Sequence, residues 1–115
     1  MKTFRELVVW QKSMDLSILV YEFTKQLPKS EQYGLVSQIR RAAVSIPSNI
    51  AEGSKRHNRK EFAQFCGIAK GSAAEIETQL VIINKVYDLN IDKLLDILIE
   101  IQKMLESLAN KLKTK

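Results

Sequence analysis

QIRRAAVSIPSNIAEGSKRHNRK, residues 38–60, contains the pattern from which the fold can be predicted. Its apolar residues recur at steps of three and four, which is typical of one face of an α-helix. The pattern continues through Pro47, and proline removes one backbone hydrogen bond and crowds the residue four positions earlier, Ala43. We therefore expect a helix that is kinked at Pro47. Its core stripe comprises Leu35, Ile39, Ala42, Ile46, Ile50 and Gly53.

Polar and glycine residues predict where this second helix and the next begin and end. Ser30 is the expected N-cap of the second helix, and Gly53 is placed to end it in a left-handed conformation. Residues 54–57 then form a short basic turn. Asn58, followed by Glu61 three residues later, has the form of a capping box that opens the third helix.

The sequence before this segment predicts a first helix from Phe4 to Gln26, which Pro28 ends. Its expected core residues are Leu7, Trp10, Met14, Ile18 and Tyr21. The third helix should run to about Asp88, with Phe62, Phe65, Ala69, Ala73, Ile76, Leu80, Ile83 and Tyr87 on one face.

After a short turn, the fourth helix should begin near Asn90 or Asp92, and its apolar residues follow a nearly heptad pattern that favours antiparallel packing. They are Ile91, Leu94, Leu98, Ile101, Leu105, Leu108 and Leu112. The length of 115 residues suits a single domain over residues 1–115. The predicted fold class is therefore all-α, an antiparallel four-helix bundle.

The last two helices carry more apolar residues than one buried stripe requires. The additional residues are Val81, Ile82, Leu95, Ile97 and Ile99. A large exposed apolar patch is unfavourable for a monomer, so we expect a homo-oligomer. Gly67 and Gly71 lie four residues apart and are expected to let a neighbouring helix approach closely.

The charge of the chain is concentrated in residues 38–60. This segment has six Lys or Arg residues and one acid, and so accounts for the whole formal net charge of +5. A local cluster of cations favours a polyanionic partner, RNA or DNA, because binding phosphates releases counterions. The alternative is a solvated loop. Trp10, Tyr21 and Tyr33 are expected in the core or at its rim rather than as platforms for bases. The candidate nucleic-acid-binding residues are Arg40, Lys55, Arg56, Arg59 and Lys60.

Polar residues also form a seam on the second and third helices, where their spacing lets them face each other. They are Arg41, Ser45, Asn49, Glu52, Ser72 and Glu75. One interpretation is a buried network that fixes helix register, with Arg40 or Arg41 paired to Glu75; the other is a functional pocket. Glu52 and Glu75 could in principle serve as paired catalytic carboxylates. No conjugate histidine accompanies them, so we expect no catalytic residues and no enzyme.

The sequence gives no indication of a cofactor, a metal or a membrane. His57 and Glu61 have the spacing of a metal pair, but a site needs three or four ligands and His57 is the single histidine. Cys66, the single cysteine, is expected in the core. No apolar run approaches the roughly 20 residues of a membrane span, and no secretory signal is evident at the N-terminus, so we expect a cytoplasmic protein.

Three phrases, FRELVVWQKSMDL, LPKSEQYGLVSQIRRAAVSIPSNIAEG and EFAQFCGIAKGSAAEIETQL, closely resemble the bacterial 23S rRNA-intervening sequence proteins. The resemblance implies an up-down four-helix bundle that assembles into a homopentameric ring. That family is similar in fold to the accessory variability proteins of diversity-generating retroelements, basic pentameric rings that work with a reverse transcriptase and nucleic acid. The family motif covers the polar seam together with Pro47, Gly53 and Gly71. These positions are structural in character, and no established activity comes with them.

Two hypotheses about function remain open at this point. The first is a non-enzymatic, homo-oligomeric protein that binds the backbone of RNA or DNA through its basic cluster, with little base specificity. The second is a scaffold whose basic turn docks an acidic protein surface, with no nucleic-acid role. A steep salt dependence of RNA binding would separate the two.

Overall fold

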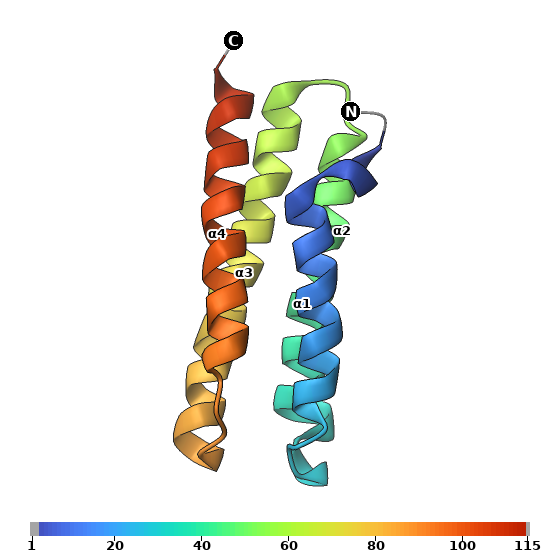
Figure 1. The fold of residues 1–115 in the computed structure, drawn as a ribbon. Coiled ribbons are helices and arrows are strands. Elements are labelled where there is room, and N and C mark those ends of the chain that lie inside the picture. The colour runs from blue at the N-terminus through green and yellow to red at the C-terminus, as the bar shows by residue number, and fades with distance from the viewer. Residues whose placement is uncertain (1–2, 115) are drawn as a thin grey trace.

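Four long helices make up most of residues 3–114, the part of the chain that this computed structural model describes. They are α1 (Val8–Thr24), α2 (Ser37–Ser54), α3 (Arg59–Tyr87) and α4 (Asp92–Lys113). Successive helices run in opposite directions, so both ends of the described chain lie at the same end of the bundle as the α2–α3 turn (Figure 1). The bundle measures 47 × 20 × 19 Å. The predicted all-α four-helix bundle is confirmed.

The core lies along the bundle axis and uses the stripes predicted for α2, α3 and α4. Its largest fully buried side chains from these helices are Ile39, Ile46, Ile50, Ile76, Leu80, Ile83, Leu98, Ile101 and Leu105. Leu35, Leu108 and Tyr87 are partly buried against them. Each buried aliphatic side chain stabilises the fold by about 1.5–3 kcal/mol relative to an exposed one, so this core dominates the stability of the bundle.

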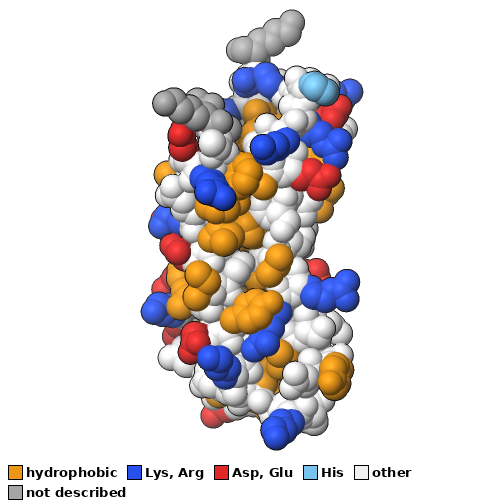
Figure 2. Space-filling view, turned by 90° about the vertical axis from the view of Figure 1, so that its right-hand side faces the viewer, with side chains coloured by type: hydrophobic (Ala, Val, Ile, Leu, Met, Phe, Trp, Pro, Cys, Tyr) orange, Lys and Arg blue, Asp and Glu red, His pale blue; other side chains and the backbone are white. Residues whose placement is uncertain are grey.

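Of the core residues predicted for the first helix, Leu7 and Trp10 are partly buried against the core, but the prediction is wrong for the other three. Met14, Ile18 and Tyr21 are 37%, 62% and 44% exposed, and hydrophobic side chains run along the middle of the face formed by α1 and α2 (Figure 2). The buried face of α1 instead carries three hydroxyl residues besides its aliphatic ones: Val9, Ser13, Leu16, Ser17, Val20 and Thr24.

Backbone carbonyls explain how these hydroxyls can be buried in α1. Ser13 Oγ donates to the carbonyl of Trp10 at 2.8 Å, and Thr24 Oγ1 donates to the carbonyl of Val20 at 2.8 Å. A buried hydroxyl is tolerated when it is hydrogen-bonded, and a helix offers such acceptors one turn back. A count of apolar residues does not detect this face.

The connection from α1 to α2 also differs from the prediction. Pro28 precedes a 3₁₀ turn, Lys29–Glu31, and a π-helical segment, Gln32–Val36, leads into α2. Ser30 is therefore not the N-cap. The side chain of Glu31 instead accepts the backbone N–H of Leu35 at 3.4 Å. The α-helix α2 then continues through Pro47, which is buried; the kink at Pro47 stays a prediction.

Gly53 has a different role from the predicted one. It lies inside α2, without a positive φ angle, so the predicted left-handed cap is wrong. A Cβ atom at Gly53 would lie 2.7 Å from Phe65 Cβ and 2.9 Å from Phe62 Cδ1. Glycine is therefore required because α2 and α3 approach closely here.

The close approach predicted at Gly67 and Gly71 is not found. Both glycines are exposed, and a Cβ atom at either would meet nothing within 4 Å among residues 3–114. Other predicted features of α3 are confirmed: its N-cap is Asn58, whose Oδ1 accepts the N–H of Glu61 at 2.8 Å. The helix ends at Asp88, which adopts the left-handed conformation with φ of 55°.

The additional apolar residues of α3 and α4 divide into two groups. Val81, Ile82 and Ile99 are exposed, whereas Leu95 and Ile97 are partly buried against the core. Over the described residues, no helix combines the length and hydropathy that a membrane span requires.

Candidate nucleic-acid interface

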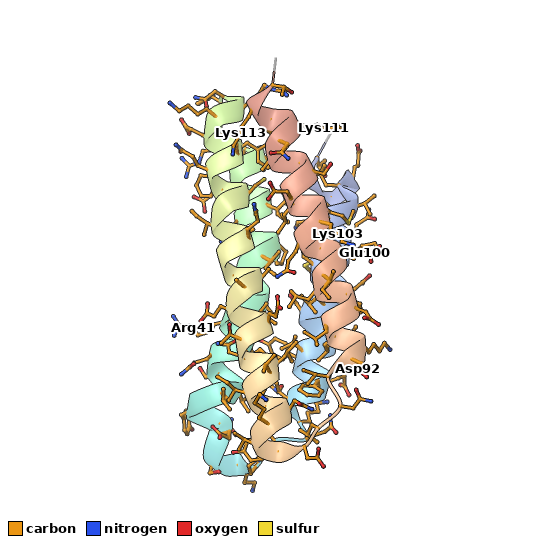
Figure 3. All side chains as sticks on the ribbon, turned by 90° about the vertical axis from the view of Figure 1, so that its left-hand side faces the viewer. Arg41, Asp92, Glu100, Lys103, Lys111 and Lys113 are labelled. Atoms are coloured by element: carbon orange, nitrogen blue, oxygen red, sulfur yellow. The ribbon has the colours of Figure 1, made fainter. Side chains whose placement is uncertain are left out.

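Cations from two separate parts of the chain meet at one end of the bundle. Lys55, Arg56, Arg59 and Lys60 lie in or beside the α2–α3 turn and are exposed. Because α4 returns to this end, Lys111 and Lys113 of its last turns lie here too (Figure 3). Lys and Arg side chains lie at this end with acidic side chains among them, and others lie along the length of the same face (Figure 2). We call these six residues the basic end.

The two lysines of α4 were not included in the predicted cluster. Their position could have been predicted from the fold, because in a four-helix bundle of alternating direction the end of α4 lies beside the α2–α3 turn. Lys111 and Lys113 lie more than 50 residues from Lys60 in the sequence, so a local count of charge does not combine them with the α2–α3 turn.

Arg59 keeps its charge but directs its guanidinium donors to the end of α4. Its Nε donates to the carbonyl of Leu112 at 3.3 Å, and its Nη2 donates to the carbonyls of Lys111 and Thr114, the latter at 3.2 Å. The last carbonyls of a helix have no partner within it, and a guanidinium supplies several donors in a fixed geometry. Arg59 therefore joins the start of α3 to the end of α4 and positions Lys111 and Lys113.

Arg56 also makes contacts within the subunit, with Glu52 and with Phe65. Its Nη2 lies 2.6 Å from Glu52 Oε2, and its guanidinium carbon lies 4.8 Å from the centroid of the Phe65 ring. Because Glu52 offsets one charge, Arg56 adds less to the field of the basic end than an unpaired arginine does.

The lysines of the basic end carry its unpaired charge. Lys55, Lys60, Lys111 and Lys113 have no ion-pair partner among the residues that the structure describes, although Lys55 Nζ lies 5.9 Å from the centroid of the Phe4 ring. Lys60 and Lys113 lie on the two sides of a groove of about 510 Å³, whose other lining residues are Ala63, Gln64 and Leu112. These two cations can therefore face one ligand together.

Glu106 lies near this groove but does not neutralise the positive charge of the groove. Lys70 donates a hydrogen bond to Glu106 and, with Lys113 adding a smaller effect, holds the pKa of that carboxyl below its ordinary value. Glu106 is therefore ionised at neutral pH, and Lys70 is the cation that offsets it.

The structure does not bring Arg40 to the basic end. Arg40 Nε donates to Thr24 Oγ1 at 2.9 Å, and its Nη2 donates to the carbonyl of Tyr21 at 3.3 Å, with the guanidinium over the Tyr21 ring. At a rise of about 1.5 Å per helical residue, Arg40 lies about 22 Å along α2 from Lys55. Its role here is to bind α2 to the end of α1.

The polar seam meets at its centre only. Ser45 Oγ lies 2.8 Å from Ser72 Oγ, and Asn49 Nδ2 donates to Ser45 Oγ at 2.9 Å. These three side chains are half-buried, so α2 and α3 are in register as the spacing predicted.

The outer members of the seam are not part of a buried network. Arg41, Glu52 and Glu75 are exposed, so the prediction of a buried network is wrong for them. No ion pair joins Arg40 or Arg41 to Glu75 among residues 3–114; Glu75 instead accepts a hydrogen bond from Gln79 at 3.3 Å. Arg41 and Glu75 instead line a groove between the two helices.

This groove between α2 and α3 has a volume of about 430 Å³, within the range of ligand sites. Its lining is mostly polar: Tyr33, Ser37, Gln38, Arg41, Ala42, Ser45, Ser72 and Glu75. Tyr33 is 94% exposed, so its expected place in the core or at its rim is wrong. Trp10, by contrast, packs against the core, with its ring centroid 5.3 Å from that of Phe4.

The surroundings of Cys66 are those of a core residue and not those of a reactive thiol. Cys66 is fully buried, and this burial raises the pKa of its thiol to about 11. The thiol is therefore protonated at neutral pH, which agrees with its predicted place in the core. Across residues 3–114, no group of three or more His, Cys, Asp or Glu side chains is arranged to hold a metal ion.

Comparison with known proteins relates this geometry to a family. A crystal structure of a protein of unknown function from the S23 ribosomal protein family of Bacteroides thetaiotaomicron is similar, with 26% sequence identity and a TM-score of 0.78 over 90% of this chain and 96% of that one. No curated protein matches the chain. Residues 5–107 match the family described as 23S rRNA-intervening sequence protein. The chain therefore belongs to the 23S rRNA-intervening sequence protein family.

Proposed function

We propose that this protein is a non-enzymatic, homo-oligomeric protein that binds the phosphate backbone of RNA or DNA through its basic end. One observation carries the proposal: the α2–α3 turn and the end of α4 bring their lysines together at a single end of the bundle. Lys60 and Lys113 face the same groove from α3 and α4. If the charge run of the α2–α3 turn were only a solvated loop, the lysines of α4 would not need to lie beside it.

The physical basis of binding is electrostatic. Each lysine that neutralises a phosphate releases counterions, which makes binding strong at low salt and weak at high salt. Four unpaired lysines and the partly offset Arg56 supply only a few phosphate contacts, so one subunit binds weakly. Several subunits on one strand would bind more tightly, because each further contact is intramolecular once the first has formed.

Exposed apolar side chains support the self-association in this proposal. Met14, Ile18 and Tyr21 of α1 and Val44 of α2 are exposed on one face, and Ile68, Ile82 and Val86 are exposed on α3. Apolar patches of this kind mark interaction surfaces. A ring of five subunits is what the family resemblance implies, and it enters here as part of the proposal.

The same apolar surfaces support a second candidate, a protein-interaction scaffold with no role in nucleic-acid binding. In that case the basic end would contact an acidic protein surface. The two candidates differ in their response to RNA. Only the first predicts that the protein binds an RNA strand and that this binding depends on salt.

The experiment measures binding of a fluorescently labelled single-stranded RNA over a salt series. Wild type is compared with the triple variant Lys55→Gln, Lys60→Gln, Lys113→Gln. A matched control, Lys29→Gln, Lys85→Gln, Lys93→Gln, removes the same charge from exposed lysines at the opposite end. Arg59 is left intact in both variants because its hydrogen bonds hold α4.

The proposal predicts that the basic-end variant loses about 2 from the slope of log K against log salt, at about 0.7 per phosphate contact. The opposite-end control should keep the wild-type slope. Equal losses in the two variants would mean that net charge alone is sensed, and absence of binding by wild type at low salt would favour the scaffold.

A further inference from the structure

We propose that the groove between α2 and α3 is a site for one unstacked base of a single strand, with the base on Tyr33, its phosphate on Arg41 and its exocyclic amine on Glu75. This inference rests on the proposed function and deepens it, because it gives the protein a preference for single strands and for amine-bearing bases.

Tyr33 is the residue that first suggests a base. Its side chain is 94% exposed beside a groove, in the segment Gln32–Val36, whose backbone departs from helical geometry at Gly34. An exposed aromatic ring is a stacking platform for any base, and stacking on one such ring changes affinity by about fivefold to a hundredfold.

The backbone that carries Tyr33 is fixed, although its ring is free. Glu31 accepts the backbone N–H of Leu35, and the hydroxyl of Tyr87 at the end of α3 donates to the same carboxylate. Glu31 therefore ties the segment to α3 before Tyr33 and, through Leu35, braces the backbone after it. A pre-positioned ring loses less conformational freedom when a base binds than a ring on a mobile loop does.

The polar groups of the groove match the remaining parts of a nucleotide. Arg41 extends from α2 away from the bundle (Figure 3), and it has no ion pair or hydrogen bond among residues 3–114, so it can bind a phosphate. Ser37 and Gln38 also line the groove with side chains that make no hydrogen bond to the described residues. Ser45 and Ser72, which bond to each other, join the two walls.

Glu75 gives the site its selectivity. A carboxylate at the groove repels a second phosphate but accepts a hydrogen bond from an exocyclic amine, such as the N4 amine of cytosine. Uracil has a carbonyl oxygen at that position, which would face the carboxylate oxygen without a proton between them. We therefore expect cytosine to bind better than uracil, two bases of the same size.

The position of the groove fits a strand that also contacts the basic end. Arg41 lies fourteen residues before Lys55, about 21 Å along α2 at 1.5 Å per residue. A strand that leaves the basic end can follow the α2–α3 face to the groove. The lining is more polar than apolar, which favours a nucleotide over an apolar helix face of a second copy.

The experiment compares labelled twelve-nucleotide oligo(C), oligo(U) and an RNA duplex of the same length, with wild type, Tyr33→Ala and the matched control Tyr33→Phe, which keeps the ring. Because Tyr33 is almost fully exposed, neither substitution should alter folding. Tyr33→Ala should weaken oligo(C) binding about fivefold to a hundredfold without a change of salt slope, and Tyr33→Phe and duplex binding should be unaffected. Glu75→Gln should remove the preference for oligo(C) over oligo(U).

The outcomes separate this inference from the proposed function. If Tyr33→Ala binds oligo(C) as wild type does while the basic-end variant is weakened, the base site is wrong and the proposed function stands. If wild type binds no strand at low salt, both are wrong. The mass of each variant is recorded as well, because a loss of oligomer in Tyr33→Ala would show that a second copy occupies the groove, which also overturns the base site.

Discussion

Ser17 Oγ of α1 lies 3.1 Å from the carbonyl oxygen of Ala43 in α2, and this carbonyl is the one that Pro47 leaves without a helical donor. In an α-helix the N–H of residue 47 would donate to residue 43, but proline has no N–H. The same hydroxyl lies 3.0 Å from the carbonyl of Ser13, so its single proton is shared between the two oxygens. A serine in one helix thus compensates for a proline in its neighbour.

This relationship predicts that Ser17→Ala lowers the free energy of unfolding by about 1–3 kcal/mol, because a buried carbonyl loses its donor. The cost should be smaller in a Pro47→Ala background, where the new N–H of residue 47 can donate to Ala43. Urea unfolding of the four proteins in this double-mutant cycle measures the coupling. The same cost in both backgrounds would show that Ser17 does not serve the Ala43 carbonyl.

Gly53 and Gly71 should respond to the same substitution in opposite ways. Gly53→Ala places a Cβ atom against Phe65 and Phe62 and should destabilise the bundle by about 1–3 kcal/mol, as overpacking does. Gly71→Ala places its Cβ atom in open space within the subunit and should stabilise α3 by up to about 1 kcal/mol. Thermal unfolding checks both signs; a Gly53→Ala variant as stable as wild type would contradict the packing described for Gly53, and a destabilised Gly71→Ala variant would contradict the open space at Gly71.

The buried thiol of Cys66 predicts a dependence of stability on alkaline pH. Its pKa is raised from 9.0 to about 11 by burial, so between these pH values the unfolded chain loses a proton that the folded chain keeps. The free energy of unfolding should therefore fall as the pH rises through this window. Cys66→Ala should remove that part of the fall, and a difference between the two proteins that is constant from pH 8 to pH 11 would contradict it.

Arg59 should act on the end of α4 rather than as one more charge. Arg59→Gln removes donors to the carbonyls of Lys111, Leu112 and Thr114, so the backbone amides of the last turn should exchange with solvent faster. Lys60→Gln is the control, since it removes the neighbouring charge without touching α4. Hydrogen exchange read by NMR distinguishes them, and equal exchange in both variants would refute the positioning role.

The exposed face of α1 predicts a loss of self-association in a variant that still folds. Ile18 is 62% exposed in the single subunit, so Ile18→Asn should leave helicity unchanged and lower the oligomer mass. Asp15→Asn, on the same helix and also exposed, is the control. Light scattering and circular dichroism together measure both properties; an unchanged mass would place the interface elsewhere.

The sequence allowed α2, α3 and α4 to be predicted because their core faces are apolar at regular spacing. It did not allow the core face of α1 to be found, since Ser13, Ser17 and Thr24 are buried there by bonding to carbonyls that a pattern of residue types does not display. Gly53 was predicted to be a glycine for its left-handed conformation, which is wrong. Glycine is required there because Phe65 of another helix leaves no space for a Cβ atom.

The candidate site was predictable only where its residues are close in sequence. Lys55, Arg56 and Lys60 were found as a charge run, but Lys113 joins them through the return of α4. Arg40 is charged but lies in the first turn of α2, at the opposite end from Lys55, where its side chain bonds to Tyr21 and Thr24 of α1. Tyr33 was expected in the core or at its rim, but it is 94% exposed in the segment Gln32–Val36, whose kink at Gly34 the sequence did not reveal.

The salt dependence of single-stranded RNA binding by the basic-end and opposite-end lysine variants decides whether the basic end binds phosphates. We expect a slope that is smaller by about 2 for Lys55→Gln, Lys60→Gln, Lys113→Gln and a wild-type slope for Lys29→Gln, Lys85→Gln, Lys93→Gln. Identical slopes for the two variants would contradict this expectation.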